Sequence, residues 1–168
     1  MLSTLICYDG SASAEHALDL ARQMLDRYQK VLLTVWTVPE RIHADSFGYE
    51  SPPGAPSYEQ LCELVEQAAQ ESAEQGAQMA AQLGLDVQIR VERNRSTVWR
   101  TILDVADELD SDLIVVGTRG TTAVQSGLLG SVSGSLVHES RRPVLLVPTP
   151  DRGADGAKDA PATSRAGV

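Results

Sequence analysis

The sequence predicts an α/β fold in which a single domain holds an open, five-stranded parallel sheet with helices on both faces. Five short apolar runs alternate along the chain with four segments whose apolar residues recur at helical spacing. The runs at residues 31–38 and 113–116 are apolar almost throughout, as expected of strands that are covered on both faces. Right-handed crossovers between successive strands then favour the strand order 3-2-1-4-5.

The first two strands and the helix between them carry recognisable end signals. Residues 2–8 form an apolar run that stops at Gly10. Ser11 or Ser13 can cap the helix that follows, and the spacing of its alanines and leucines extends this helix to residue 25. The second strand is expected at residues 31–38.

The middle of the chain predicts a long loop, a long helix and an edge strand. Residues 41–57 contain several prolines, and a loop of this length is typical of a lid over a site. Helical spacing resumes at residues 61–83, and Gly84 ends that helix. Residues 85–91 alternate between apolar and polar side chains, so we expect the third strand to be half exposed at a sheet edge.

The last elements surround a glycine-rich turn. Ser96 or Thr97 begins a helix that runs to residue 109, and a short strand follows at residues 113–116. Beyond the turn, a helix over residues 131–140 leads to the final strand at 144–147. We place the domain at residues 1–148 and expect the tail, 149–168, to be disordered because it has no periodicity and is rich in Gly, Ala, Asp and Pro.

Composition narrows the classes of function. The chain has 168 residues and a net charge of −9, which repels a nucleic acid or an anionic membrane but leaves a small phosphorylated ligand possible. Cys7 and Cys62 do not form a C-x-x-C pair, which favours a reducing compartment. The apolar run at the amino terminus lacks the basic start of a signal peptide, so we expect a cytoplasmic protein that does not enter a membrane.

The glycine-rich turn is the candidate ligand-binding feature. Gly117-Thr118-Arg119-Gly120 follows a buried strand, and Gly130-Ser131 comes nine residues later at the start of a helix. Such a turn can present amides and a helix N-terminus to an anion, with the glycines at positive φ. We therefore expect the amides of 117–120 and 130–131 to be unpaired and to converge on a phosphate group. Alternatively, Gly117 ends the strand and Gly130 eases the start of the helix, with no ligand involved.

The predicted strand order brings a second polar feature to the same place. Ligands of open α/β sheets bind where the chain reverses direction, outside the carboxyl ends of the strands. In this order the reversal lies between the first and fourth strands, so Asp9 should lie near the glycine-rich turn. Asp9 can also cap the first helix instead of contacting a ligand.

The spacing Gly-x-x-Gly, nine residues, Gly-Ser resembles the ATP-binding signature of the universal stress protein family. Residues 106–120 and 130–148 resemble that family's fourth and fifth strands with their flanks, and Asp9 occupies the position of the family's aspartate after the first strand. The resemblance covers residues 2–148 and implies a Rossmann-like fold. It departs from the family at Arg93-Asn94-Arg95, where many relatives have a glycine before the third helix, and this departure affects the mouth of the site.

The resemblance implies a role for each residue of the site. The glycines and serines would hold the phosphates and ribose, Asp9 would lie beside the adenosine, and Cys7 and Val35 would lie near the adenine. Arg119 either pairs with phosphate or points to solvent. The implied ATP-binding residues are Cys7, Asp9, Val35, Gly117, Arg119, Gly120, Gly130, Ser131, Val132 and Ser133.

The family also implies a function and an assembly. We expect a regulatory protein that binds ATP, with or without Mg²⁺, reports stress to an unidentified protein partner, and forms a homodimer through residues 144–147. A slow ATP hydrolase with Mg²⁺ on Asp9 is the second hypothesis. A flavodoxin-like electron carrier is the third, although the turn after the first strand is short for a flavin phosphate. An interaction module that binds no nucleotide is the fourth.

Overall fold

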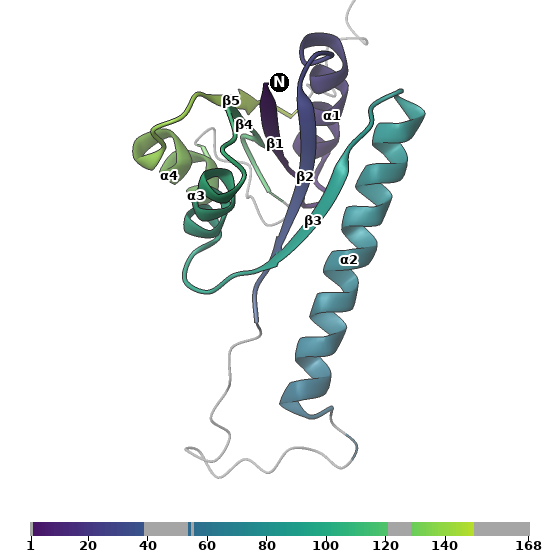
Figure 1. Ribbon diagram of the computed structural model, residues 1–168. Coiled ribbons are helices and arrows are strands. Elements are labelled where there is room, and N and C mark those ends of the chain that lie inside the picture. The colour runs from purple at the N-terminus through teal and green to yellow at the C-terminus, as the bar shows by residue number, and fades with distance from the viewer. Residues whose placement is uncertain (1, 39–53, 55, 121–128, 150–168) are drawn as a thin grey trace, which may run out of the picture.

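The computed structural model describes residues 2–38, 54, 56–120 and 129–149, which form one five-stranded sheet flanked by helices (Figure 1). All strands are parallel, and their order is β3-β2-β1-β4-β5, as predicted. The elements are β1 (Ser3–Cys7), α1 (Ala12–Met24), β2 (Gln29–Trp36), α2 (Tyr58–Gln82), β3 (Gln88–Arg93), α3 (Val98–Glu108), β4 (Leu113–Gly117), α4 (Ser131–Glu139) and β5 (Val144–Val147).

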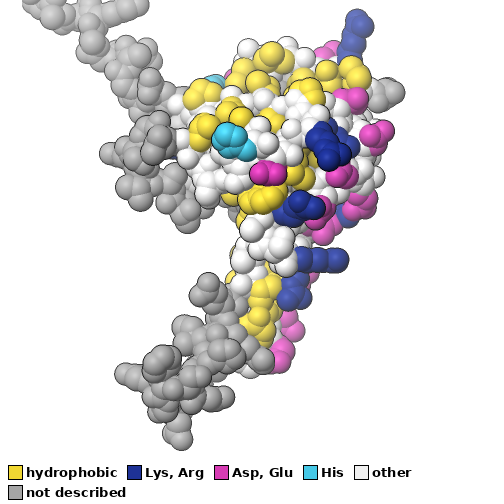
Figure 2. Space-filling model, turned by 90° about the vertical axis from the view of Figure 1, so that its left-hand side faces the viewer, with side chains coloured by type: hydrophobic (Ala, Val, Ile, Leu, Met, Phe, Trp, Pro, Cys, Tyr) yellow, Lys and Arg dark blue, Asp and Glu magenta, His cyan; other side chains and the backbone are white. Residues whose placement is uncertain are grey.

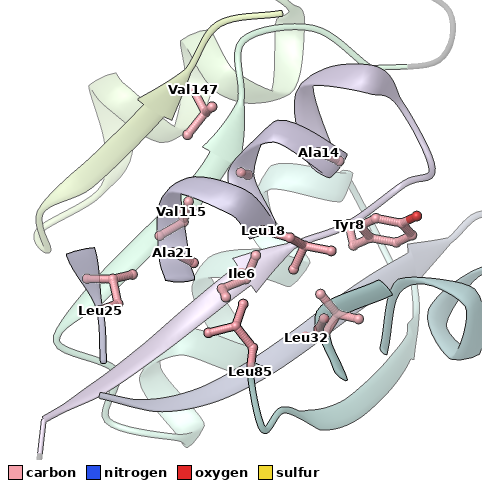
Figure 3. Close-up of a cluster of buried hydrophobic side chains, with 12 residues drawn as sticks. Ile6, Tyr8, Ala14, Leu18, Ala21, Leu25, Leu32, Leu85, Val115 and Val147 are labelled. Atoms are coloured by element: carbon pink, nitrogen blue, oxygen red, sulfur yellow. The ribbon is translucent and has the colours of Figure 1, made fainter. Parts of the chain in front are cut away.

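Helices cover both faces of the sheet because successive strand residues point to opposite sides. Ile6 and Leu32 are fully buried under α1 and α2, in the cluster that Figure 3 shows with Leu18 of α1. Their neighbours Leu5 and Leu33 point the other way and pack against α3 and α4. Each central strand therefore contributes to two cores, which explains why these runs are apolar at nearly every position.

The structure corrects the predicted start of α2 and confirms its predicted end at Gly84. Ser57 and Gln60 form a capping box, so the helix begins at Tyr58 and not at residue 61. At the other end Gly84, at φ +78°, and Leu85 complete a Schellman motif, in which the Leu85 N–H donates to the Ala80 carbonyl at 2.8 Å.

The third strand is therefore shorter at its start than predicted. Leu85 is buried against the helical side of the core, and β3 covers 88–93 instead of 85–91. Its residues are half exposed or exposed, which confirms the predicted edge position. The second strand is shifted as well, to 29–36 from the predicted 31–38.

The first part of α2 extends beyond the carboxyl ends of β2 and β3 (Figure 1). Its buried residues begin only at Ala69, and Leu61 and Leu64 are 36% and 57% exposed. Figure 2 shows apolar and acidic side chains along this projecting part of the molecule. Within the described residues, every helix is too short or too polar to cross a membrane.

Two predictions concern segments outside the described residues. Most of the predicted lid, 41–57, lies in the range 39–53 and at residue 55, and the predicted disordered tail lies at 150–168. Both stay predictions.

Candidate functional site

A cavity of about 580 Å³ opens at the carboxyl ends of β1, β2 and β4, between the first turns of α1, α3 and α4. The strand order reverses here, between β1 and β4, as predicted. The cavity is lined by every residue that the sequence singled out for the site: Cys7, Asp9, Val35, Gly117, Arg119, Gly120, Gly130, Ser131, Val132 and Ser133.

One part of the cavity is an apolar slot. Leu33 and Val35 of β2 form one wall, and Val98 and Ile102 of α3 form the facing wall. Val116 of β4 also lines it. A slot between a strand wall and a helix wall suits a flat, apolar ring system.

Cys7 also lines the cavity, and its side chain is buried. Burial, and secondarily the nearby Asp9 carboxylate, raises the pKa of the Cys7 thiol to about 12. The thiol is therefore neutral at physiological pH, and since the thiolate is the nucleophilic form, Cys7 acts here as a small apolar residue.

The other part of the cavity is polar and is built on the first turn of α4. Gly130 is the N-cap and provides no side-chain cap, and the first backbone bond of the helix runs from the Gly134 N–H to the Gly130 carbonyl. Ser131, Val132 and Ser133 come before Gly134 in the chain, so their amide N–H groups have no acceptor within the helix. All three residues line the cavity, so a helix N-terminus borders its polar end.

The predicted set of unpaired amides was partly wrong. The Thr118 N–H donates to the Val147 carbonyl at 2.8 Å, and the Gly130 N–H donates to the Thr118 carbonyl at 2.9 Å. The Ser133 hydroxyl lies 3.0 Å from the Thr118 and Gly130 carbonyl oxygens and donates to them. These bonds join the turn to α4, so Ser133 shapes the site with its hydroxyl.

The glycines of the turn are not at positive φ, contrary to the sequence prediction, but two of them lie close to neighbouring atoms. The described glycines at positive φ are Gly10, Gly54 and Gly84. A Cβ on Gly120 would lie 2.8 Å from Asp9 Oδ2, and a Cβ on Gly130 would lie 3.2 Å from the Thr118 carbonyl oxygen.

Two serines that the sequence analysis considered only as helix caps hold the glycine-rich turn in place. Ser11 is the N-cap of α1, and its hydroxyl also donates to the Arg119 carbonyl at 3.3 Å. The Ser13 hydroxyl, 1% exposed, donates to the same carbonyl. The repeated small polar residues after Gly10 were the signal that could have indicated this contact.

Asp9 and Arg119 provide the charge at the polar end. Asp9 is exposed and does not cap α1 itself; its Oδ1 accepts a hydrogen bond from the Ser11 amide at 3.0 Å. The Arg119 side chain is half buried and forms no ion pair with any described residue. A guanidinium without a carboxylate partner at a helix N-terminus favours an anionic ligand.

Comparison with known proteins identifies the family. The family model of the universal stress proteins matches residues 2–148, and the chain belongs to that family. A universal stress protein of Methanocaldococcus jannaschii is 28% identical over 140 residues, which cover 83% of this chain and 75% of the relative.

Solved structures agree on the fold. Universal stress protein UspA from Lactobacillus plantarum superimposes with a TM-score of 0.68 and 21% identity, covering 87% of this chain and 97% of that one. The universal stress protein from Archaeoglobus fulgidus in complex with dAMP has a TM-score of 0.59 and 19% identity, covering 88% of this chain and 98% of that one.

Proposed function

We propose that the cavity binds an adenine nucleotide, with ATP as the ligand. The observation that carries this proposal is the division of one cavity into an apolar slot and a polar end bordered by the amides of Ser131, Val132 and Ser133. The adenine would occupy the slot, and the phosphates would accept hydrogen bonds from these amides. The dAMP complex of the Archaeoglobus fulgidus relative supports this assignment.

The charged groups at the polar end fit a phosphate chain. Arg119 can neutralise part of the phosphate charge, and the positive end of the α4 dipole adds to this attraction. Asp9 is the carboxylate among the described lining residues. One carboxylate together with phosphate oxygens and water is the usual ligand set of a nucleotide-bound Mg²⁺, so Asp9 is the residue that would hold this ion.

We assign the protein a regulatory role in the stress response, in the cytoplasm, with at most slow hydrolysis. Phosphoryl transfer needs a group that positions water or an acceptor. The described lining residues include no histidine, lysine or glutamate, and the Cys7 thiol is neutral. Nucleotide occupancy would then be the signal that a protein partner recognises. The slow hydrolase and the module without nucleotide are the alternatives that binding and turnover measurements separate.

We further propose a homodimer through β5. Among the described strands β5 pairs only with β4, so its outer edge can hydrogen-bond to the same strand of a second copy. Sedimentation equilibrium at micromolar protein should report a dimer, and a monomer at that concentration would contradict the proposal.

Calorimetric titration with ATP tests the proposed site. Val35→Trp should fill the apolar slot and weaken ATP binding at least tenfold, about 1.4 kcal/mol. Ile89→Trp is the matched control, since Ile89 is exposed on the neighbouring strand β3 and outside the cavity. Thermal unfolding verifies that both variants fold. Absence of ATP binding by the wild-type protein would refute the proposal, and many turnovers per minute would favour the hydrolase.

A further inference from the structure

Asn94 connects three elements at the mouth of the cavity. Its amide N–H donates to the Trp36 carbonyl at the end of β2, at 2.7 Å. Its side-chain Oδ1 accepts a hydrogen bond from the Ser96 amide at 3.1 Å, and it shares the Thr101 hydroxyl proton of α3, at 3.3 Å, with the Thr97 carbonyl oxygen at 3.2 Å. Its Nδ2 donates to the Thr37 hydroxyl oxygen at 3.2 Å. Asn94 therefore fixes the start of α3 relative to the end of β2.

The orientation of the Asn94 amide follows from its partners. A backbone N–H can only donate, so the atom that faces the Ser96 amide must be the oxygen. The NH₂ group then faces Thr37, and the Thr37 oxygen is the acceptor in that contact. The Thr37 hydroxyl keeps its own proton, and this proton has no acceptor among the described residues.

Thr37 faces the apolar slot. Side chains along a strand alternate, so Leu33, Val35 and Thr37 lie on one side of β2 and its extension, and all three line the cavity. The first two are apolar, and the facing wall is formed by Val98 and Ile102 of α3. Thr37 therefore places a hydroxyl on the β2 side of the slot, whereas the polar end lies on the β4 side.

We propose that the Thr37 hydroxyl donates a hydrogen bond to a ring nitrogen of the bound purine, and that Asn94 is the positioning residue that keeps this proton directed at the base. This inference rests on the proposed nucleotide function and assigns the polar contact that recognises the base. A purine presents acceptor nitrogens at its edge, and the apolar walls contact its faces. Asn94 also joins β2 to α3, so it sets the separation of the two walls of the slot.

Thr37→Val tests the contact, because valine keeps the shape of threonine and removes the hydroxyl. ATP binding should weaken about 3–10-fold, the usual value of one neutral hydrogen bond. Inorganic tripolyphosphate has no base, so its affinity should not change. Ser96→Ala is the matched control: Ser96 is exposed, its hydroxyl has no partner among the described residues, and it lies outside the cavity lining.

Asn94→Asp tests the positioning role. The carboxylate retains an acceptor for Ser96 and Thr101, and its second oxygen now accepts the Thr37 proton and directs it away from the ligand. The affinity for ATP should fall by the same factor as in Thr37→Val, and the double variant should lose no more than either single variant. An unchanged tripolyphosphate affinity verifies that the added charge does not act on the phosphates.

The outcomes separate this inference from the proposed function. If wild-type protein binds ATP and Thr37→Val binds it equally well, the base contact is wrong. Equal weakening of ATP and tripolyphosphate would also overturn it, because the effect would not lie at the base. Additive losses in the double variant would overturn the role of Asn94. If the wild-type protein binds no ATP, the proposed function fails, and this inference fails with it.

Discussion

Gly117, at the end of β4, packs directly against Ser13 in the first turn of α1. A Cβ on Gly117 would lie 2.9 Å from the Ser13 Cβ and 3.2 Å from its carbonyl carbon, and closer still to the hydroxyl oxygen. The same serine hydroxyl donates to the Arg119 carbonyl. This contact therefore fixes the position of the glycine-rich turn relative to α1 at the end of β4. It thereby also fixes the position of the polar end of the cavity.

Gly117→Ala should destabilise the fold. The added methyl group meets backbone and Cβ atoms that cannot rotate away, so we expect a loss of about 1–3 kcal/mol in the free energy of unfolding. Denaturant unfolding measures this loss. Gly134→Ala is the matched control, because Gly134 lies in α4 and a Cβ there meets nothing within 4 Å. It should stabilise the protein by about 0.5–1 kcal/mol. Equal stability of Gly117→Ala and wild type would contradict the close packing.

The buried Cys7 thiol predicts a loss of stability at alkaline pH. Its pKa is raised from 9.0 to about 12 in the folded protein, so the folded state holds a proton that the unfolded state releases. The contribution is complete below pH 9 and is lost as the pH rises from 9 towards 12, by about 1.4 kcal/mol per pH unit. Urea unfolding at a series of pH values should follow this slope.

Two alanine variants isolate the thiol that causes this slope. Cys7→Ala should have a smaller decline of stability between pH 9 and pH 10 than wild type, whatever its stability at neutral pH. Cys62→Ala should keep the wild-type decline, because Cys62 is half exposed on α2. Burial, and then the charges of Glu15 and Asp9, also raise the pKa of the buried Tyr8 above 10.0. Tyr8 would therefore add to the decline above pH 10, so the variants are compared with wild type below that pH. A decline that Cys62→Ala removes would refute the assignment.

Arg142 should stabilise the junction between α3 and β5. Its Nε donates to the Ser111 carbonyl at 2.7 Å, and its guanidinium pairs with Asp107 at the end of α3. The Arg142 side chain is 22% exposed, so solvent weakens this pairing only in part. We expect Arg142→Ala to lower the free energy of unfolding by about 1–2 kcal/mol. Arg141→Ala, at an exposed neighbour, should stay within about 0.5 kcal/mol of wild type.

The sequence predicted the strand order and the location of the site for a physical reason. In a parallel sheet the carboxyl ends of all strands lie at one edge, so Asp9 and the glycine-rich turn had to meet once the alternation of strands and helices was recognised. The predicted start of β3 was wrong because Leu85 is apolar for a reason unrelated to a strand. Its amide closes the end of α2 and its side chain packs in the core, and periodicity alone does not distinguish this from a strand.

Contacts between distant residues could not be predicted from spacing. The glycine pattern was consistent with positive φ, but Gly117 is a glycine because Ser13, over a hundred positions earlier, occupies the space of its side chain. The bond between Asn94 and Thr37 likewise joins the ends of two strands across a long segment. Asn94 stood out in the sequence only as a departure from a family pattern.

The central claim is that the free amides at the start of α4 bind the phosphates, and Ser131→Pro tests it most directly. Proline is favoured at the first position of a helix, and Gly130, at φ −60° and ψ 157°, already has the conformation required before a proline. The fold should therefore be unchanged while one amide is removed. We predict an ATP affinity lower by about 10–100-fold, the range for a hydrogen bond to a charged group.

Ser131→Ala is the control for the hydroxyl and should retain most of the affinity for ATP. Titration calorimetry on the wild type and these two variants is the decisive measurement. A large loss in Ser131→Pro beside a small loss in Ser131→Ala is the predicted result. If Ser131→Pro binds ATP as tightly as the wild type, the phosphates do not lie on the first turn of α4.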